Sequence, residues 1–411
     1  MNVLAVLRWL LLAAEVWVGL PLLYLALLTT GAIVASRRRD APSAHVTARA
    51  TARYRFAVLV PAHDEERVLG GLLESLGRLD YPREDYAICV IADNCADHTA
   101  ALARGIAGVR VYERVNLAER GKGYALAWML ERLTAEAATF DAYVVIDADA
   151  VVDPRFLTAM ARALAGGAQA LQGKNTVLNV GDSASTALRW IALTLVNHVR
   201  PLGRNALGGS STLTGNGMCL TAALLRRYPW RAFGLAEDYQ YYLTLVAHGV
   251  CVRYVPQAVV RSLMPTTFRQ LRTQDIRWES REAGQRAWQW RVARQLLADG
   301  VRQRDWMRLD ALAEFLTPPL SVLACACALG LTLGLLLRSP LAVLLGALLV
   351  GVLLGYVGSV FYLLRPPLAV YRALPHAPRF AARKLWIYFV LSRSRKHTAT
   401  WVRTSRTLSA E

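Results

Sequence analysis

The chain has 411 residues, of which 55% are hydrophobic, and it carries a formal net charge of +18. This length allows one sizeable folded domain with further elements, and the apolar content is too high for an ordinary soluble protein. Many cations flank apolar segments, where anionic headgroups attract them, so we expect membrane lipids as partners and no nucleic acid.

The N-terminal segment predicts a membrane helix. Residues 16–35 contain no charged residue and are long enough to cross a bilayer. Three arginines at 37–39 follow directly, which disfavours a cleaved signal peptide and predicts a cytoplasmic end. We therefore expect residues 1–39 to form an interfacial or transmembrane helix. A linker at 40–54 would then lead into a domain on the cytoplasmic face of the cell (inner) membrane.

Four short apolar runs alternate with helical patterns in the next part of the chain. They lie at 56–60, 87–92, 109–112 and 143–146. Because right-handed crossovers make successive strands parallel, we expect an α/β domain with a mostly parallel sheet. Acidic or polar residues follow the strands, so they should converge at the rim where ligands bind.

The last of these runs ends on Asp147-Ala148-Asp149, two carboxylates spaced i, i+2. Hard divalent cations prefer oxygen ligands, and they often bind through one or two carboxylates together with substrate phosphates. Asp149 and Asp147 are therefore candidate metal ligands, with Mg2+ or Mn2+ as the expected ion. The same pattern also fits a capped strand-to-helix turn.

The C-terminal part predicts a membrane hairpin within residues 311–366. Residues 316–337 and 341–364 are each long and apolar enough to span a bilayer, and only Arg338-Ser339-Pro340 separates them. The chain then returns to the cytoplasmic side, where basic residues accumulate. Residues 367–411 are expected to form a basic amphipathic tail at the membrane interface.

Seven motifs together resemble the family 2 glycosyltransferases. The resemblance implies a GT-A (Rossmann-like) fold for residues 55–310, and it is nearest to the membrane-bound branch of polysaccharide synthases and ceramide-glucosyltransferase-like enzymes. Two positions depart from the family pattern, because Ala236 stands where threonine is usual and Asp275 where glutamine is common. The motifs are VLVPAHDEE at 58–66, IADNCADHT at 91–99, GKG at 121–123, DAD at 147–149, TGNGMCL at 214–220, AED at 236–238 and QDIRW at 274–278.

The resemblance implies inverting transfer of a sugar from a nucleoside-diphosphate sugar, with uridine as the expected nucleoside. Asp238 is the expected general base, next to Glu237. Gly215, Asn216, Gly217 and Trp278 are expected near the acceptor. The expected donor-binding residues are Pro61, Ala62, Glu65, Asp93, Lys122, Asp147, Asp149, Gln274, Arg277 and Trp278.

Ordinary structural roles compete with these assignments. Asp93 and Asp238 could cap helices, Lys122 could be a solvated helix-start lysine, and 274–278 could be an amphipathic interfacial helix. Arg200 and Arg204 lie on a segment that could contact a lipid-linked acceptor.

The nature of the acceptor is left open between two versions. We expect transfer to a lipid, lipid-linked or polysaccharide acceptor, and a processive polysaccharide synthase with coupled export is the alternative. Three spans are few for a channel, so that alternative would require a homo-oligomer or an export partner.

A nucleotidyltransferase and a catalytically silent membrane subunit are the competing functions, and the presence of every motif acid argues against the silent subunit.

Overall fold

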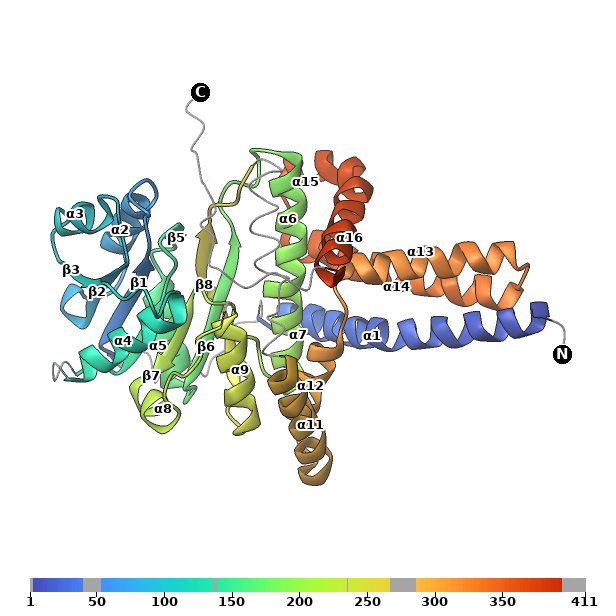
Figure 1. Ribbon diagram of the computed structural model, residues 1–411, viewed down its shortest axis with the longest axis horizontal. Helices are drawn as coiled ribbons and strands as arrows, with labels where there is room; N and C mark the ends of the chain where they lie inside the picture. Colours follow the sequence, from blue (N-terminus) through green and yellow to red (C-terminus); the bar gives the residue numbers. More distant parts are fainter. Residues whose placement is uncertain (1–2, 40–52, 136–138, 235, 267–285, 394–411) are drawn as a thin grey trace.

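The computed structural model describes residues 3–39, 53–135, 139–234, 236–266 and 286–393 (Figure 1). These residues form an α/β domain, and three long helices project side by side from one flank of it. The N-terminus lies at the far tip of this projection (Figure 1).

The domain contains an eight-stranded sheet in the order β3-β2-β1-β4-β7-β6-β8-β5. β1 pairs in parallel with β2 and β4, β2 with β3, and β6 with β8. β7 runs antiparallel to β4 and β6, and β5 runs antiparallel to β8. The predicted α/β fold with a mostly parallel sheet is confirmed. The strands are β1 (Phe56–Ala62), β2 (Tyr86–Asp93), β3 (Val109–Arg114), β4 (Ala142–Val145), β5 (Ala150–Val152), β6 (Ala170–Val177), β7 (Met218–Thr221) and β8 (Val252–Ser262).

Helices cover both faces of the sheet. Phe56 and Val58 of β1 pack with α2 and α5 on one face, whereas Ala57 and Leu59 pack with α4 and α9 on the other. A strand buried on both faces needs apolar residues at every position, which explains the continuous run in the sequence. The helices of the domain are α2 (Leu69–Gly77), α3 (Thr99–Arg104), α4 (Lys122–Ala135), α5 (Phe156–Ala165), α6 (Ala184–Thr194), α7 (Arg200–Ala206), α8 (Ala222–Arg227), α9 (Glu237–Ala247), α11 (Arg286–Gln303) and α12 (Trp306–Leu316).

Residues 146–149 connect β4 to β5, although these strands are far apart in the sheet. β5 lies four strand intervals from β4, which would be about 19 Å in a flat sheet. The five steps from Val145 to Ala150 can reach at most about 18 Å. The sheet must therefore curl to bring β5 close to β4. The connection that carries Asp147 and Asp149 is a turn, in which the backbone N–H of Ala150 donates to the carbonyl oxygen of Asp147 at 3.1 Å.

Two helices, α1 (Val3–Arg39) and α14 (Pro340–Leu364), are long and apolar enough to cross a membrane. A third span is present if α12 and α13 (Leu320–Leu336) are counted as one bent element. The predicted span at 316–337 is shorter in the structure. Pro318 and Pro319 separate the two helices, which meet at a bend of 69°.

The helices α13 and α14 form a hairpin that packs beside α1. Arg8 donates from Nη2 to the carbonyl oxygen of Leu337 at 2.8 Å, which caps the C-terminal end of α13. Leu22 and Leu25 of α1 are buried, and α1 packs against α7 of the domain. The exposed apolar residues of α1 therefore begin nearer the N-terminus than the predicted span at 16–35.

Two further helices, α15 (Leu368–Ala373) and α16 (Ala377–Arg393), lie across the base of the three long helices (Figure 1). α15 packs against α6, so the base of the projection is attached to the domain at this point. The final residues, 394–411, lie outside the described part of the chain.

Candidate active site

Lys122, at the start of α4, joins two of the acidic motifs. Its Nζ lies 2.5 Å from Asp147 Oδ1, 2.5 Å from the carbonyl oxygen of Gly215 and 3.9 Å from Glu237 Oε1. Asp238 belongs to the same group, because its carboxylate lies beside Gly215. A Cβ atom added to Gly215 would be 2.9 Å from Oδ2 of Asp238. The D-x-D segment, the glycine loop at 215–217 and the start of α9 thus surround one ammonium group.

Burial disfavours charge on the members of this cluster. Burial alone would lower the pKa of Lys122. The carboxylates of Asp147 and Glu237 have the larger, opposite effect, so the pKa of Lys122 is raised. Burial raises the pKa of Glu237 to about 8, and the adjacent Asp238 adds to this shift. Burial also raises the pKa of Asp238, which the charge of Lys122 partly offsets. Lys122 therefore keeps these acids more ionised than burial alone would allow.

The glycine loop at residues 215–217 fixes the D-x-D segment through the side chain of Asn216. Asn216 Oδ1 accepts from the backbone N–H of Asp147 at 3.1 Å, and Asn216 Nδ2 donates to Ser262 Oγ at 2.9 Å. The Asn216 side chain is buried and both of its polar atoms are bonded within the protein, so it positions the segment. Gly215 and Gly217 have φ values of 73° and 76°, a conformation that favours glycine. Ser262 is a supporting residue that no sequence motif indicated.

The predicted nucleoside-binding acid, Asp93, lies at the end of β2 in a buried ion pair. Arg114 Nη1 donates to Asp93 Oδ1 at 2.7 Å, and Asn94 Nδ2 donates to the same oxygen at 3.0 Å. Pro61 and Ala62 end the neighbouring strand β1, in register with residues 91 and 92 of β2. The sequence did not identify Arg114, whose pairing with Asp93 spans 21 positions.

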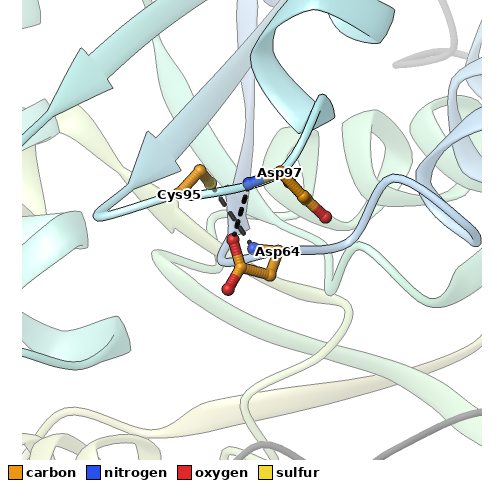
Figure 2. A group of neighbouring side chains, drawn as sticks. All are labelled: Asp64, Cys95 and Asp97. Atoms are coloured by element: carbon orange, nitrogen blue, oxygen red, sulfur yellow. Dashed lines mark hydrogen bonds between the residues drawn. The ribbon is translucent and has the colours of Figure 1, made fainter.

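A second acidic group lies beside these strand ends, and Figure 2 shows its three side chains. Ligand atoms of Asp64, Cys95 and Asp97 lie within 4.8 Å of one another. However, Asp64 Oδ1 accepts from the backbone N–H groups of Ala96 and Asp97 at 2.7 and 3.2 Å. Burial raises the pKa of the Cys95 thiol to about 11, so the sulfur is protonated near neutral pH. We interpret this group as a structural contact that connects the loop after β1 to the loop after β2.

Glu65 lies in the first of these loops. Its backbone N–H donates to Thr99 Oγ1 at 2.8 Å, and its carbonyl oxygen accepts from Leu69 at the start of α2. The backbone of Glu65 therefore helps to fix the loop that follows β1.

The D-x-D residues provide the donor set for a divalent cation. Asp147 and Asp149 are both half-buried and offer only carboxylate oxygens, the ligand type that Mg2+ and Mn2+ prefer. Glu237 and Asp238 lie in the same cluster, in which Lys122 contributes a positive charge among the described residues. A group of several carboxylates of this kind fits a site completed by a divalent ion.

Three predicted donor-site residues, Gln274, Arg277 and Trp278, lie outside the described residues. The expectation that Arg200 and Arg204 face an acceptor is wrong. Both are buried, and they pair with Glu314 at 3.0 Å and with Asp310 at 2.8 Å.

The chain is similar to glycosyltransferases in three comparisons. A family model described as "Glycosyltransferase like family 2" matches residues 52–280. A probable glycosyltransferase, YdaM, of Bacillus subtilis is 25% identical over 230 residues, which are 54% of each chain. A beta-monoglucosyldiacylglycerol synthase of Trichormus variabilis is 30% identical over 166 residues, which are 39% of this chain and 34% of that protein. The chain thus spans about half or less of the length of these relatives.

One solved structure supports the fold along nearly the whole chain. It is the mannosyltransferase PcManGT from Pyrobaculum calidifontis in complex with GDP-Man and Mn2+, which superposes with a TM-score of 0.55 at 18% identity. The match covers 93% of this chain and 99% of that one. At this identity the likeness establishes the shared architecture alone.

Proposed function

Because the chain belongs to glycosyltransferase family 2, we propose that it transfers a sugar from a nucleoside-diphosphate sugar, with UDP as the expected nucleotide, to a membrane acceptor. The reaction would take place at the cytoplasmic face of the cell (inner) membrane. The observation that carries the proposal is the group formed by Lys122, Asp147, Glu237 and Asp238, in which the D-x-D segment meets the acidic start of α9.

Asp238 is the proposed general base. As the acceptor oxygen bonds to the anomeric carbon, the hydroxyl proton passes to the Asp238 carboxylate, and the bond from that carbon to the diphosphate oxygen breaks. The backbone N–H of Tyr239 donates to Asp238 Oδ1 at 2.7 Å, which fixes the carboxylate at the first turn of α9. Attack opposite the leaving group gives inversion.

Asp149 and Asp147 would hold Mg2+ or Mn2+, which supplies charge neutralisation for the leaving diphosphate. Lys122 adds a fixed positive charge beside them. Asp93, Pro61 and Ala62, at neighbouring strand ends, would bind the nucleoside. Gln274, Arg277 and Trp278 keep their proposed roles by family resemblance.

A lipid or lipid-linked acceptor fits this chain best. The domain is joined to long apolar helices that could cross a membrane, and one relative is named as a beta-monoglucosyldiacylglycerol synthase. A polysaccharide synthase would need an export channel, for which the chain would have to associate with further copies or with a partner.

The test is a screen of nucleotide sugars against membranes that contain the protein, with released nucleoside diphosphate measured with and without chelator. We expect one donor to give chelator-sensitive release and a glycosylated lipid detectable by mass spectrometry. Release of pyrophosphate would establish a nucleotidyltransferase instead. Long polymer in the product would favour the synthase, and turnover by no donor would support a silent subunit.

A further inference from the structure

A buried chain of polar contacts runs from the membrane helix α1 to the catalytic helix α9. Tyr24 of α1 donates from its hydroxyl to Asp310 Oδ1 at 2.8 Å. Arg204 of α7 donates from Nε to Asp310 Oδ2 at 2.8 Å and from Nη2 to the hydroxyl of Tyr242 in α9 at 2.7 Å. Four elements, α1, α12, α7 and α9, are thus linked through one arginine.

The central ion pair is fully enclosed. The Arg204 and Asp310 side chains are each 1% exposed. A buried pair is tolerated only with good geometry and additional hydrogen bonds, and the two tyrosine hydroxyls supply these bonds. Replacing either tyrosine leaves a buried charge with one partner fewer, so the chain favours a single arrangement.

The position of Arg204 is set by the contact of its helix with α1. A Cβ at Gly203 would collide with the carbonyl oxygen of Leu28, so the backbones of α7 and α1 touch. Gly31 lies at the same crossing, where an added Cβ would be 3.2 Å from the carbonyl oxygen of Gly203. The residue after Gly203 therefore has little freedom to move relative to the membrane helix.

The other end of the chain lies one helical turn from the proposed base. Asp238 and Tyr242 are spaced i, i+4 on α9, so both side chains lie on the same face of that helix. We propose that Arg204 is a positioning residue for sugar transfer. Through Tyr242 it orients the helix that presents Asp238, and through Asp310 and Tyr24 it sets that helix relative to α1. This inference rests on the proposed role of Asp238.

A double-mutant cycle on the full-length protein in lipid nanodiscs tests the coupling. We expect Tyr24→Phe and Tyr242→Phe each to lower kcat by about three- to tenfold with little change in donor KM, because the donor-binding residues are untouched. The double variant should be no slower than the worse single variant, since either change already interrupts the chain. Multiplied effects of the two changes would overturn the proposal, as would an unchanged kcat in Tyr24→Phe.

Tyr241→Phe is the matched control. Tyr241 is a neighbouring buried tyrosine on α9, but its hydroxyl donates to the carbonyl oxygen of Tyr228 at 2.7 Å. The loss of this bond should affect stability without any link to α1. We therefore expect the effects of Tyr241→Phe and Tyr24→Phe on kcat to multiply.

Hydrogen–deuterium exchange gives a readout that does not depend on turnover. Tyr24→Phe should speed amide exchange in residues 239–247, whereas Tyr362→Phe should not, because the hydroxyl of Tyr362 accepts from exposed Arg37 of α1 and takes no part in the contacts that reach α9. Unchanged exchange in both variants would refute the coupling even if the protein transfers sugar. Faster exchange in Tyr24→Phe alone, in a protein with no transferase activity, would uphold the coupling and refute the proposed function.

Discussion

Lys122 Nζ lies 2.5 Å from Asp147 Oδ1, and this ion pair joins two motifs that are 25 positions apart. The same ammonium lowers the pKa of Glu237 and of Asp238, although burial raises both above their ordinary values. The fixed charge of Lys122 therefore helps to keep the proposed base ionised.

Lys122→Gln should shift the acidic limb of the pH–rate profile to higher pH. Without the ammonium, the pKa of Asp238 rises further, so a greater fraction of the base is protonated and inactive at any pH below the limb. The pH dependence of kcat/KM measures this shift. Arg78→Gln, at an exposed pair with Glu74, should leave the limb in place. A limb that does not move in Lys122→Gln would contradict the assignment.

Asp238→Asn should lower kcat by about 100- to 10,000-fold, since an amide cannot accept the hydroxyl proton. Donor binding should persist, which titration with the nucleoside diphosphate would measure. Glu237→Gln is the matched comparison. Burial raises the pKa of Glu237 to about 8, which favours its neutral form, so replacement by the neutral amide should cost less activity. Normal product formation by Asp238→Asn would remove Asp238 from the mechanism.

Asp149→Asn should raise the Mn2+ concentration needed for half-maximal activity by about tenfold or more, because a neutral amide binds the cation more weakly than a carboxylate. Chelator should abolish activity, and added Mn2+ or Mg2+ should restore it. Asp64→Asn should leave this metal requirement unchanged, because Asp64 already accepts two backbone N–H bonds. A raised requirement in Asp64→Asn would locate the ion at the other acidic group.

Arg114→Met should lower the stability of the domain by about 3 kcal/mol, because it leaves the Asp93 carboxylate buried without its ionic partner. Arg78→Met should cost no more than about 1 kcal/mol, since its pair with Glu74 is exposed. Thermal denaturation of the two variants in the same detergent compares them. Equal midpoints would show that the Arg114 pair is not structurally important.

Gly203→Ala should destabilise the protein strongly, because its Cβ would collide with the carbonyl oxygen of Leu28 at the α1–α7 crossing. Gly71→Ala is the control within α2. An added Cβ there meets nothing within 4 Å, and alanine favours a helix by up to about 1 kcal/mol. Thermal midpoints should fall for the first variant and stay level or rise for the second. A stable Gly203→Ala protein would show that α1 and α7 can separate.

The central strands could be predicted because burial on both faces leaves a continuous apolar run, as in 56–60 and 87–92. The position of β5 in the sheet could not be predicted from the sequence. Its three residues give no periodic signal, and they pair with β8 more than 100 positions later. The helix α13 begins later than the predicted span at 316–337, because two prolines interrupt an apolar stretch that composition alone treats as continuous.

The residues of the candidate site were likewise predictable only in part. Local motifs indicated Asp147, Asp149 and Asp238, because each acid stands at the end of a strand or the start of a helix. Supporting residues such as Arg114 and Ser262 are ordinary in sequence and gain their roles only when distant strands pair. Arg204 was expected on a segment that contacts an acceptor, but it pairs in the interior with Asp310, 106 positions later, which no local pattern indicates.

The backbone of both aspartates in the D-x-D segment is held by hydrogen bonds. The N–H of Ala150 donates to the carbonyl oxygen of Asp147 at 3.1 Å, and the N–H of Leu263 donates to that of Asp149 at 3.2 Å. A pair of carboxylates on a loose loop could contract or spread to suit ions of different radius, whereas here these bonds limit how far the two residues can separate. Adaptation to one metal over another would then have to come from the other oxygens around the ion, namely those of water and of the sugar nucleotide.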